Sequence, residues 1–206
     1  MKKVVILANG EYPKRKNSTQ ILQDCKYIIA CDGAANKLIK KGINPYAVIG
    51  DLDSLKSKYK NNESLNIIHI DDQESNDLTK AFKFALTLNP SEILIFGATG
   101  KREDHTLGNI SLMFEFSELT TVPFKMVTDF GEFLVISQSS SLKIGKNKHI
   151  SLFSNKSSMV LENRGLKYQT NKVKFDLWWK ATLNVTLEDI IEFRFNSGKL
   201  MIYIQS

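Results

Sequence analysis

Short apolar runs alternate with helical patterns over the first 120 residues, and this alternation constrains the fold most strongly. The runs are continuous in their apolar character, which is typical of strands that are buried on both faces of a parallel sheet. They are Val4–Ala8, Tyr27–Cys31, Val48–Ile49, Asn66–Ile70 and Ile93–Phe96. Apolar residues at helical spacing fill residues 34–41, 78–88 and 107–119. We therefore predict an α/β fold with an open, mostly parallel sheet flanked by helices.

The pattern changes after Pro123, where short runs rich in Val, Ile, Phe and Tyr are separated by turn residues. Such spacing is typical of a small antiparallel β-sandwich. We therefore predict two domains, an N-terminal α/β domain over residues 1–122 and a C-terminal antiparallel β-sandwich over residues 123–206. Within the second domain, Asn196-Ser197-Gly198 separates two apolar runs, which predicts a hairpin at this point.

Composition places the chain among globular proteins. Of its 206 residues, 42% are hydrophobic and 24% are charged, which is enough apolar material for a buried core. No run approaches the length of a membrane span or a secretory signal. The two cysteines, Cys25 and Cys31, are too few for a disulfide framework. We therefore expect a cytoplasmic protein that does not associate with membranes.

Aspartate side chains follow the predicted strands, at or just beyond the point where each strand ends. The residues at these positions are Asp32, Asp51, Asp53, Asp77 and Asp104. In open α/β sheets, ligands bind at this edge. Crowded carboxylates repel one another unless a cation separates them, and oxygen ligands suit Mg²⁺, which commonly bridges to substrate phosphates. The sequence therefore predicts a magnesium site that receives a phosphate-bearing substrate.

Gly50-Asp51-Leu52-Asp53-Ser54 is the sharpest local motif. In an extended chain, Asp51 and Asp53 point to the same side, because successive side chains of a strand alternate. Two carboxylates on one side can share a divalent ion. Gly50 permits a ligand to approach the backbone closely.

Gly97-Ala98-Thr99-Gly100-Lys101-Arg102 follows the strand at residues 93–96, but it does not match the phosphate-binding P-loop. It remains a flexible turn that ends in two cations. Lys101 and Arg102 are suited to neutralising phosphate charge. His105, beside Asp104, is the one histidine near the acidic positions of the sequence.

Four motifs, in this order and spacing, resemble those of the thiamine pyrophosphokinase family. They are Asp32-Gly33-Ala34-Ala35-Asn36, Gly50-Asp51-Leu52-Asp53-Ser54, Asp72-Gln73-Glu74-Ser75-Asn76-Asp77-Leu78 and Gly97-Ala98-Thr99-Gly100-Lys101-Arg102-Glu103-Asp104-His105-Thr106. The tail, with Gly165-Leu166-Lys167-Tyr168, Asn184 and Gly198, resembles the thiamine-binding domain of that family. The chain departs from the family pattern at Ala34, Asn76 and Leu183, where the family commonly has Gly, Thr and Ser.

The resemblance implies a homodimeric, Mg²⁺-dependent enzyme that transfers a pyrophosphoryl group from ATP to the hydroxyl of thiamine, giving thiamine diphosphate and AMP. It implies that Asp51, Asp53 and Asp77 hold the metal. It implies catalytic roles for these three residues and for Arg102 and Asp104. It places near the nucleotide Asp32, Asn36, Gln73, Lys80, Lys101 and His105. The sequence leaves open which carboxylate deprotonates the thiamine hydroxyl.

Thiamine is cationic and has two heteroaromatic rings, so its site needs aromatic faces and a polar edge. Residues 178–184 supply both tryptophans of the chain, Trp178 and Trp179, close to Thr182 and Asn184. On an extended strand the two tryptophans face opposite sides. We therefore expect one of them in the sandwich core and the other exposed, where it is covered by thiamine or by a partner subunit.

Two other functions stay open at this point. A haloacid-dehalogenase-like phosphatase also places Asp-x-Asp after an apolar strand, and it would use Asp51 as its nucleophile. An anion- or RNA-binding module would use residues 123–206, which hold 12 of the 28 basic but 7 of the 22 acidic residues. A phosphoaspartate at Asp51 favours the phosphatase, and salt-dependent RNA binding without turnover favours the module. The sequence has no basic run with interleaved aromatic residues, so we expect no nucleic-acid partner.

Overall fold

The computed structural model describes residues 2–60, 62–72 and 74–206, and the chain divides into two compact units. Unit 1 consists of Met1–Leu112 and Thr120–Asp129, and unit 2 consists of Met113–Leu119 and Phe130–Ser206. The proposed domain boundary between residues 122 and 123 falls inside the second segment of unit 1. Within the described ranges, the helices are too short or too polar to cross a membrane.

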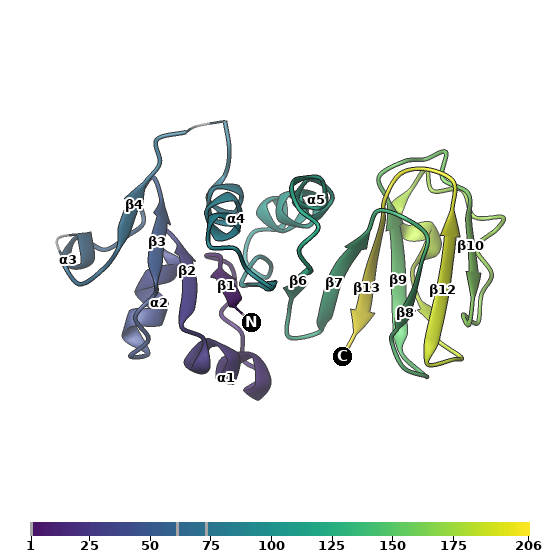
Figure 1. Cartoon of the computed structure of the whole chain (residues 1–206), viewed down its shortest axis with the longest axis horizontal. Coiled ribbons are helices and arrows are strands. Elements are labelled where there is room, and N and C mark those ends of the chain that lie inside the picture. The colour runs from purple at the N-terminus through teal and green to yellow at the C-terminus, as the bar shows by residue number, and fades with distance from the viewer. Residues whose placement is uncertain (1, 61, 73) are drawn as a thin grey trace. The chain divides into compact units, whose positions relative to one another are not determined.

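Unit 1 is built on a parallel sheet (Figure 1). Its strands in the described ranges are β1 (Lys3–Leu7), β2 (Tyr27–Cys31), β3 (Ala47–Gly50), β4 (Ile67–His69), β5 (Glu92–Phe96) and β6 (Phe124–Val127). Their order across the sheet is β6-β5-β1-β2-β3-β4, and neighbouring strands are parallel. The strand order reverses at β1, which lies between β2 and β5. At such a reversal a crevice opens beyond the carboxyl ends of the strands.

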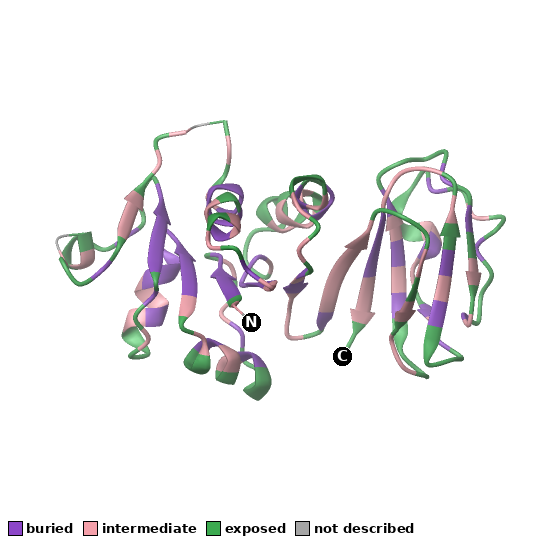
Figure 2. Cartoon of the chain, viewed as in Figure 1, coloured by how far each residue is buried: buried purple, intermediate pink, exposed green. Residues whose placement is uncertain are grey.

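Helices cover both faces of this sheet. Of the helices in the described ranges, α1 (Lys16–Asp24) and α2 (Ala34–Lys40) lie on one face and α4 (Asp77–Thr87) on the other. The other two are α3 (Ser57–Lys60) and α5 (Glu103–Leu119), whose last residues from Met113 belong to unit 2. Leu22 of α1 and Leu38 of α2 share a core with strand residues such as Val5. The next residue of β1, Ile6, faces the other side, because side chains alternate along a strand. Helix α4, with its buried Phe82, packs against β1, β2 and β3, whose strands are buried along most of their length (Figure 2).

The predicted strands of this sheet are confirmed, and so are the helices α2, α4 and α5. The sequence pattern does not indicate α1, because Ile21 and Leu22 are its only apolar residues and two neighbouring positions show no period. A tertiary contact fixes its start instead. The Asp129 carboxylate, beyond β6, accepts hydrogen bonds from the backbone N–H groups of Lys14 at 3.0 Å and Arg15 at 3.2 Å.

Unit 2 contains two antiparallel sheets that share one core. Its strands in the described ranges are β7 (Gly131–Ile136), β8 (Ser140–Lys143), β9 (His149–Ser154), β10 (Leu161–Arg164), β11 (Asn184–Val185), β12 (Ile190–Phe195) and β13 (Leu200–Gln205), and a 3₁₀ helix, η1 (Trp178–Ala181), precedes β11. The strand orders are β11-β9-β13-β7 and β10-β12-β8. Leu152 and Ile202 of the first sheet pack with Leu161, Ile191 and Phe193 of the second. This arrangement confirms the predicted antiparallel β-sandwich.

The predicted hairpin at Asn196-Ser197-Gly198 is wrong, because β12 and β13 belong to different sheets. Strand β12 pairs with β8 and β10, whereas β13 pairs with β7 and β9. Hydrogen bonds between this turn and residues 155–160 hold it in place. Asn196 Oδ1 accepts a hydrogen bond from the Val160 N–H at 3.0 Å, and Asn155 Oδ1 accepts one from the Lys199 N–H at 2.7 Å. These long-range contacts turn a hairpin-like sequence into a crossing between the two layers.

Candidate active site

A cleft of about 530 Å³ lies at the carboxyl end of the unit 1 sheet. Its walls come from the loops that follow β1, β2, β3, β4 and β5 and from the first turns of α4 and α5. The residues predicted for the site that line it are Asp32, Asp51, Asp53, Asp77, Lys80, Lys101, Arg102 and His105. The cleft therefore lies where the reversal of strand order places a ligand site.

Asp32 is a buried carboxylate at the end of β2, only 4% exposed. Its Oδ2 accepts a hydrogen bond from the backbone N–H of Ser54 at 3.0 Å, whereas its Oδ1 is buried without a hydrogen-bond partner among the described residues. Burial raises the pKa of Asp32. An unpaired carboxylate oxygen in a buried position is costly, so this atom is suited to a ligand.

Asp51 and Asp53 lie in a turn, and the expected extended geometry does not occur. Leu52 between them has a φ of 65°, and Asp51 Oδ1 accepts a hydrogen bond from the Asp53 N–H at 3.2 Å. The Ser54 hydroxyl donates to Asp53 Oδ1 at 2.9 Å, and this hydrogen bond lowers the pKa of Asp53. The turn still keeps both carboxylates at the cleft.

Asp32, Asp51 and Asp53 form a group that we call the acidic triad. Each residue offers one oxygen atom, and these atoms lie within 4.8 Å of one another. Gly50, with a φ of 150°, makes this approach possible: a Cβ at this position would lie 3.0 Å from Asp32 Cβ and from Asp77 Cγ. The triad therefore presents clustered oxygen ligands of the kind that a hard divalent cation prefers.

Asp77 begins α4, and its carboxyl group lies close to Gly50, as Asp32 does. Burial raises its pKa, and repulsion by Asp51 adds to the effect. Lys80, one turn further along the helix, is buried. Its Nζ donates to the Ile70 carbonyl at 3.0 Å and lies 3.8 Å from Asp77 Oδ1. Lys80 is therefore a cation held in place beside the carboxylates.

Arg102 and Asp104 form a forked ion pair at the start of α5. Nε and Nη2 of Arg102 donate to the two carboxylate oxygens of Asp104, at 3.1 and 2.5 Å. The hydrogen bonds from Arg102 lower the pKa of Asp104 to about 2, so this carboxylate is a weak proton acceptor. Both side chains are exposed, and a phosphate group can therefore compete for the guanidinium fork. His105 lines the cleft beside them.

Two further residues predicted near the nucleotide hold loops of unit 1. Lys101 Nζ donates to the Asn9 carbonyl at 2.7 Å, which links the loops after β1 and β5. Asn36 of α2 donates to the Ser54 carbonyl at 2.9 Å and accepts a second hydrogen bond, at 3.1 Å, from the same loop. It thereby fixes the loop that carries Asp51 and Asp53. Gln73 lies outside the described residues.

The tryptophans lie in unit 2, on η1 rather than on a strand. Trp178 is 40% exposed and Trp179 is 68% exposed. The expectation that one of them fills the sandwich core is wrong, because a 3₁₀ turn replaces the extended backbone that would send them to opposite sides. Trp178 packs instead on Phe153 of β9, with ring centroids 5.6 Å apart. With the exposed Leu177 and Leu183, the two tryptophans form what we call the η1 surface.

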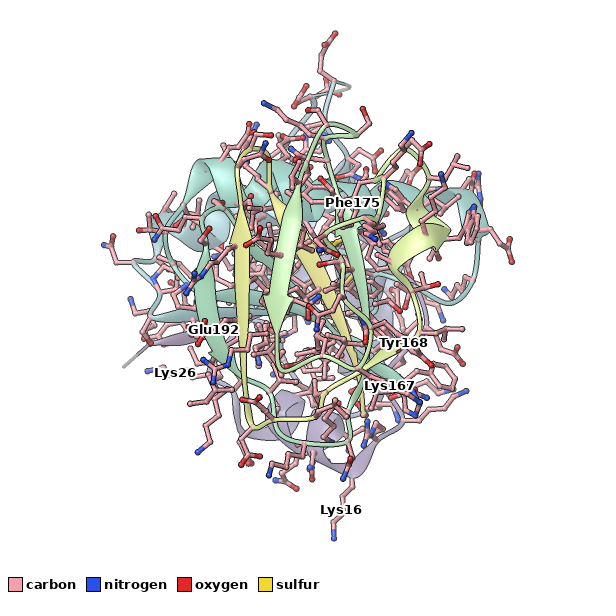
Figure 3. All side chains as sticks on the ribbon, turned by 90° about the vertical axis from the view of Figure 1, so that its right-hand side faces the viewer. Lys16, Lys26, Lys167, Tyr168, Phe175 and Glu192 are labelled. Carbon is pink, nitrogen blue, oxygen red and sulfur yellow. The ribbon has the colours of Figure 1, made fainter. Side chains whose placement is uncertain are left out.

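Thr182 and Asn184 make hydrogen bonds within unit 2. Asn184 is buried, its Oδ1 accepts from the Tyr168 N–H at 3.0 Å, and its Nδ2 donates to the Tyr168 carbonyl at 2.8 Å. The Thr182 hydroxyl donates to the Trp179 carbonyl at 2.7 Å. These bonds hold the backbone of η1 and of Tyr168, whose exposed ring lies next to Lys167 on the face that Figure 3 turns to the viewer.

Asn9 and Gly10 also line the cleft, although the acidic pattern of the sequence does not indicate them. Gly10 packs so tightly that a Cβ would lie 2.3 Å from the Gly97 carbonyl oxygen, to which its own N–H donates at 2.6 Å. The two residues follow the first strand, as Asp32 follows the second. Their position directly after a buried strand is therefore the signal in the sequence that indicates them, although neither residue is charged.

Curated relatives resemble part of the chain. Thiamin pyrophosphokinase 1 of Caenorhabditis elegans is 31% identical over 128 residues, which are 57% of this chain and 52% of that protein. Thiamine pyrophosphokinase of Bacillus subtilis (strain 168) is 31% identical over 119 residues, which are 56% of each. The chain thus spans about half the length of the curated relatives it matches.

Solved structures and family models extend the similarity to both units. A crystal structure of thiamine pyrophosphokinase from Bacillus subtilis shares the fold, with a TM-score of 0.82 at 23% identity, covering 100% of this chain and 99% of that one. Residues 18–124 match the family model described as the thiamin pyrophosphokinase catalytic domain, and residues 131–203 match that of the thiamin pyrophosphokinase substrate-binding domain. The chain belongs to the thiamin pyrophosphokinase family.

Proposed function

We propose that the protein is a thiamine pyrophosphokinase, which transfers a pyrophosphoryl group from ATP to the hydroxyl of thiamine and releases AMP. The observation that carries this proposal is the acidic triad in one cleft with Lys80, Lys101 and Arg102. Phosphoryl-type transfer depends mainly on positioning and charge neutralisation, which carboxylates for a metal and cations for phosphates supply. Family membership favours this activity over the phosphatase and the RNA-binding module.

We assign Mg²⁺ to the acidic triad. The unpartnered, buried Oδ1 of Asp32 and the approach of three carboxylates within 4.8 Å fit a hard divalent cation. Asp32 thereby joins the ligands expected from the sequence, and Asp77 lies close to Gly50 beside Asp32. When bound, the cation offsets the repulsion among these carboxylates and the negative charge of the ATP phosphates.

The cations on the other loops are suited to orienting the phosphates. Arg102 presents a planar fork that matches two phosphate oxygens, and Asp104 holds that fork before the nucleotide arrives. Because its pKa is about 2, Asp104 stays ionised and orients Arg102 rather than taking the proton of the thiamine hydroxyl. Lys80 supplies a buried charge whose position is fixed by the Ile70 carbonyl.

We propose that the η1 surface receives the thiamine rings and is covered by a second subunit of a homodimer. An exposed indole such as that of Trp179 offers a face to a cationic ring. Clustered exposed apolar side chains mark interaction surfaces on soluble proteins. The residues of the η1 surface lie within the match to the substrate-binding domain, which supports a role in thiamine recognition.

The activity itself is tested by incubating the protein with ATP, Mg²⁺ and thiamine and identifying the products by chromatography. We expect AMP and thiamine diphosphate in equal amounts, because the pyrophosphoryl group moves as one unit. Removal of Mg²⁺ with a chelator should abolish turnover, and its return should restore it. The products ADP and thiamine monophosphate would contradict the proposal.

Substitution of the metal ligands tests the acidic triad. We expect Asp51→Asn and Asp53→Asn to lower kcat by about 100-fold or more, because each removes a charged ligand from the metal while leaving the core intact. Asp24→Asn, on the exposed end of α1, serves as a matched control and should leave kcat unchanged. Thermal unfolding of all three variants verifies that they fold. Near-normal turnover of both triad variants would exclude the metal assignment.

Arg102→Lys tests whether the guanidinium fork orients the nucleotide. Lysine keeps the positive charge but cannot donate two parallel hydrogen bonds, so we expect the KM for ATP to rise by about tenfold. The KM for thiamine should change little. Steady-state kinetics with each substrate varied in turn provide the measurement. If both constants stay as in the wild type, Arg102 is a surface cation without a role in binding.

Alanine substitutions of the tryptophans test the η1 surface. We expect Trp179→Ala, or Trp178→Ala, to raise the KM for thiamine by about tenfold and to leave the KM for ATP unchanged, because loss of an aromatic face weakens binding of a cationic ring. Thiamine should also quench the tryptophan fluorescence of the wild-type protein. Absence of quenching, together with wild-type KM values in both variants, would place thiamine elsewhere.

A further inference from the structure

Lys37 and Lys101 bring two ammonium groups together beside the cleft, on the loop that follows β1. Lys37 extends from α2 and donates to the Gly10 carbonyl at 2.6 Å, and Lys101 donates to the adjacent Asn9 carbonyl at 2.7 Å. Lys101 lines the cleft, and Lys37 is its near neighbour. Two neighbouring positive charges repel each other, so an anion that binds against both ammonium groups stabilises the arrangement.

The charged groups around Lys37 offset only part of the repulsion between its ammonium group and that of Lys101. Burial, together with the neighbouring Lys101, lowers the pKa of Lys37 to about 8, while Glu11 acts in the opposite direction. Glu11 is itself paired with Lys14, whose Nζ lies 2.5 Å from its Oε1. The two backbone carbonyls occupy one donor position on each ammonium group and leave the others for a ligand.

We propose that Lys37 and Lys101 form a paired-ammonium subsite for one phosphate group of the nucleotide, in which Lys101 contacts the phosphate and Lys37 is a positioning residue. This inference rests on the proposed function, because it takes the ligand of the cleft to be ATP. Both ammonium groups donate to carbonyls of the loop after β1, whereas the acidic triad comes from the loops after β2 and β3, and Lys37 adds a cation that the sequence motifs do not identify. The subsite therefore uses other side chains than the acidic triad.

If Lys37 acts on a bound phosphate, nucleotide binding depends on pH, which a purely structural lysine would not cause. A bound phosphate favours the charged form of Lys37, so it raises the pKa of this group from about 8. Above that pH, nucleotide binding therefore draws a proton from solution onto Lys37, whereas near pH 7 the group is already charged and no proton moves. Nucleotide affinity accordingly falls as the pH rises through the pKa of the free protein.

Calorimetric titration with Mg²⁺ and a non-hydrolysable α,β-methylene analogue of ATP tests this consequence. Measurements in two buffers of different ionisation enthalpy give the number of protons taken up. For the wild type we expect about half a proton or more near pH 8.5 and close to none near pH 7. Lys37→Met should weaken binding near pH 7 by about tenfold and abolish the uptake.

The variants Lys37→Arg and Lys40→Met distinguish the effect of the charge of Lys37 from a structural effect of substitution. Arginine stays charged throughout this range, so Lys37→Arg should keep the affinity within about threefold, lose the proton uptake and make affinity independent of pH. Lys40, exposed at the end of the same helix, serves as the matched control and should behave as the wild type. Proton uptake that persists in Lys37→Arg, or wild-type affinity in Lys37→Met, would overturn the inference. An arginine variant as weak as the methionine variant would overturn it too.

The assay of products distinguishes this inference from the proposed function. If the wild type makes thiamine diphosphate and AMP but proton uptake is insensitive to Lys37, the paired-ammonium subsite is wrong and the enzyme assignment holds. If the analogue binds with uptake that depends on Lys37 but no thiamine diphosphate forms, the subsite holds and the enzyme assignment is wrong. If the analogue does not bind, both are wrong.

Discussion

Repulsion among carboxylates at the end of a buried sheet is the constraint on which the site depends. Three carboxylate oxygens of the acidic triad lie within 4.8 Å of one another. Backbone N–H groups of Asp53 and Ser54 donate to two of the three carboxylates, and Asn36 fixes the loop that supplies these donors. The positions of the carboxylates are therefore maintained by hydrogen bonds between loops, whereas the apolar core beneath them maintains the strands.

The topology of unit 1 distributes charge around the reversal of strand order. The carboxylates come from the loops after β2 and β3, and the cations come from α2, α4 and the loop after β5. Because β1 lies between β2 and β5, Lys101 and Arg102 come from the other side of β1 than the carboxylates, whereas Lys80 lies beside Asp77. A polyphosphate with a bound metal carries charge of both signs and is complementary to such a cleft.

Strand ends were predictable from the sequence, because continuous apolar runs mark buried parallel strands and the aspartates follow them directly. The geometry of the loops was not predictable to the same degree. The positive φ of Leu52 depends on hydrogen bonds made around it by Asp32 and Ser54, which are separated in sequence. In the same way, η1 and the crossing after Phe195 depend on contacts with distant residues, whereas the local sequence favours a strand and a hairpin.

The crossing between β12 and β13 delays strand pairing in unit 2 during synthesis of the chain. Strand β13 lies between β7 and β9, so that sheet is incomplete until Leu200–Gln205 has left the ribosome. In unit 1, β1, β2 and β3 pair in the order of synthesis, but the other edge of β1 pairs with β5, which is synthesised much later. Strand pairing over long sequence separations is slow, and unpaired strand edges promote aggregation in the meantime. Both units therefore keep unpaired strand edges until a later strand emerges, which is β5 in unit 1 and β13 in unit 2.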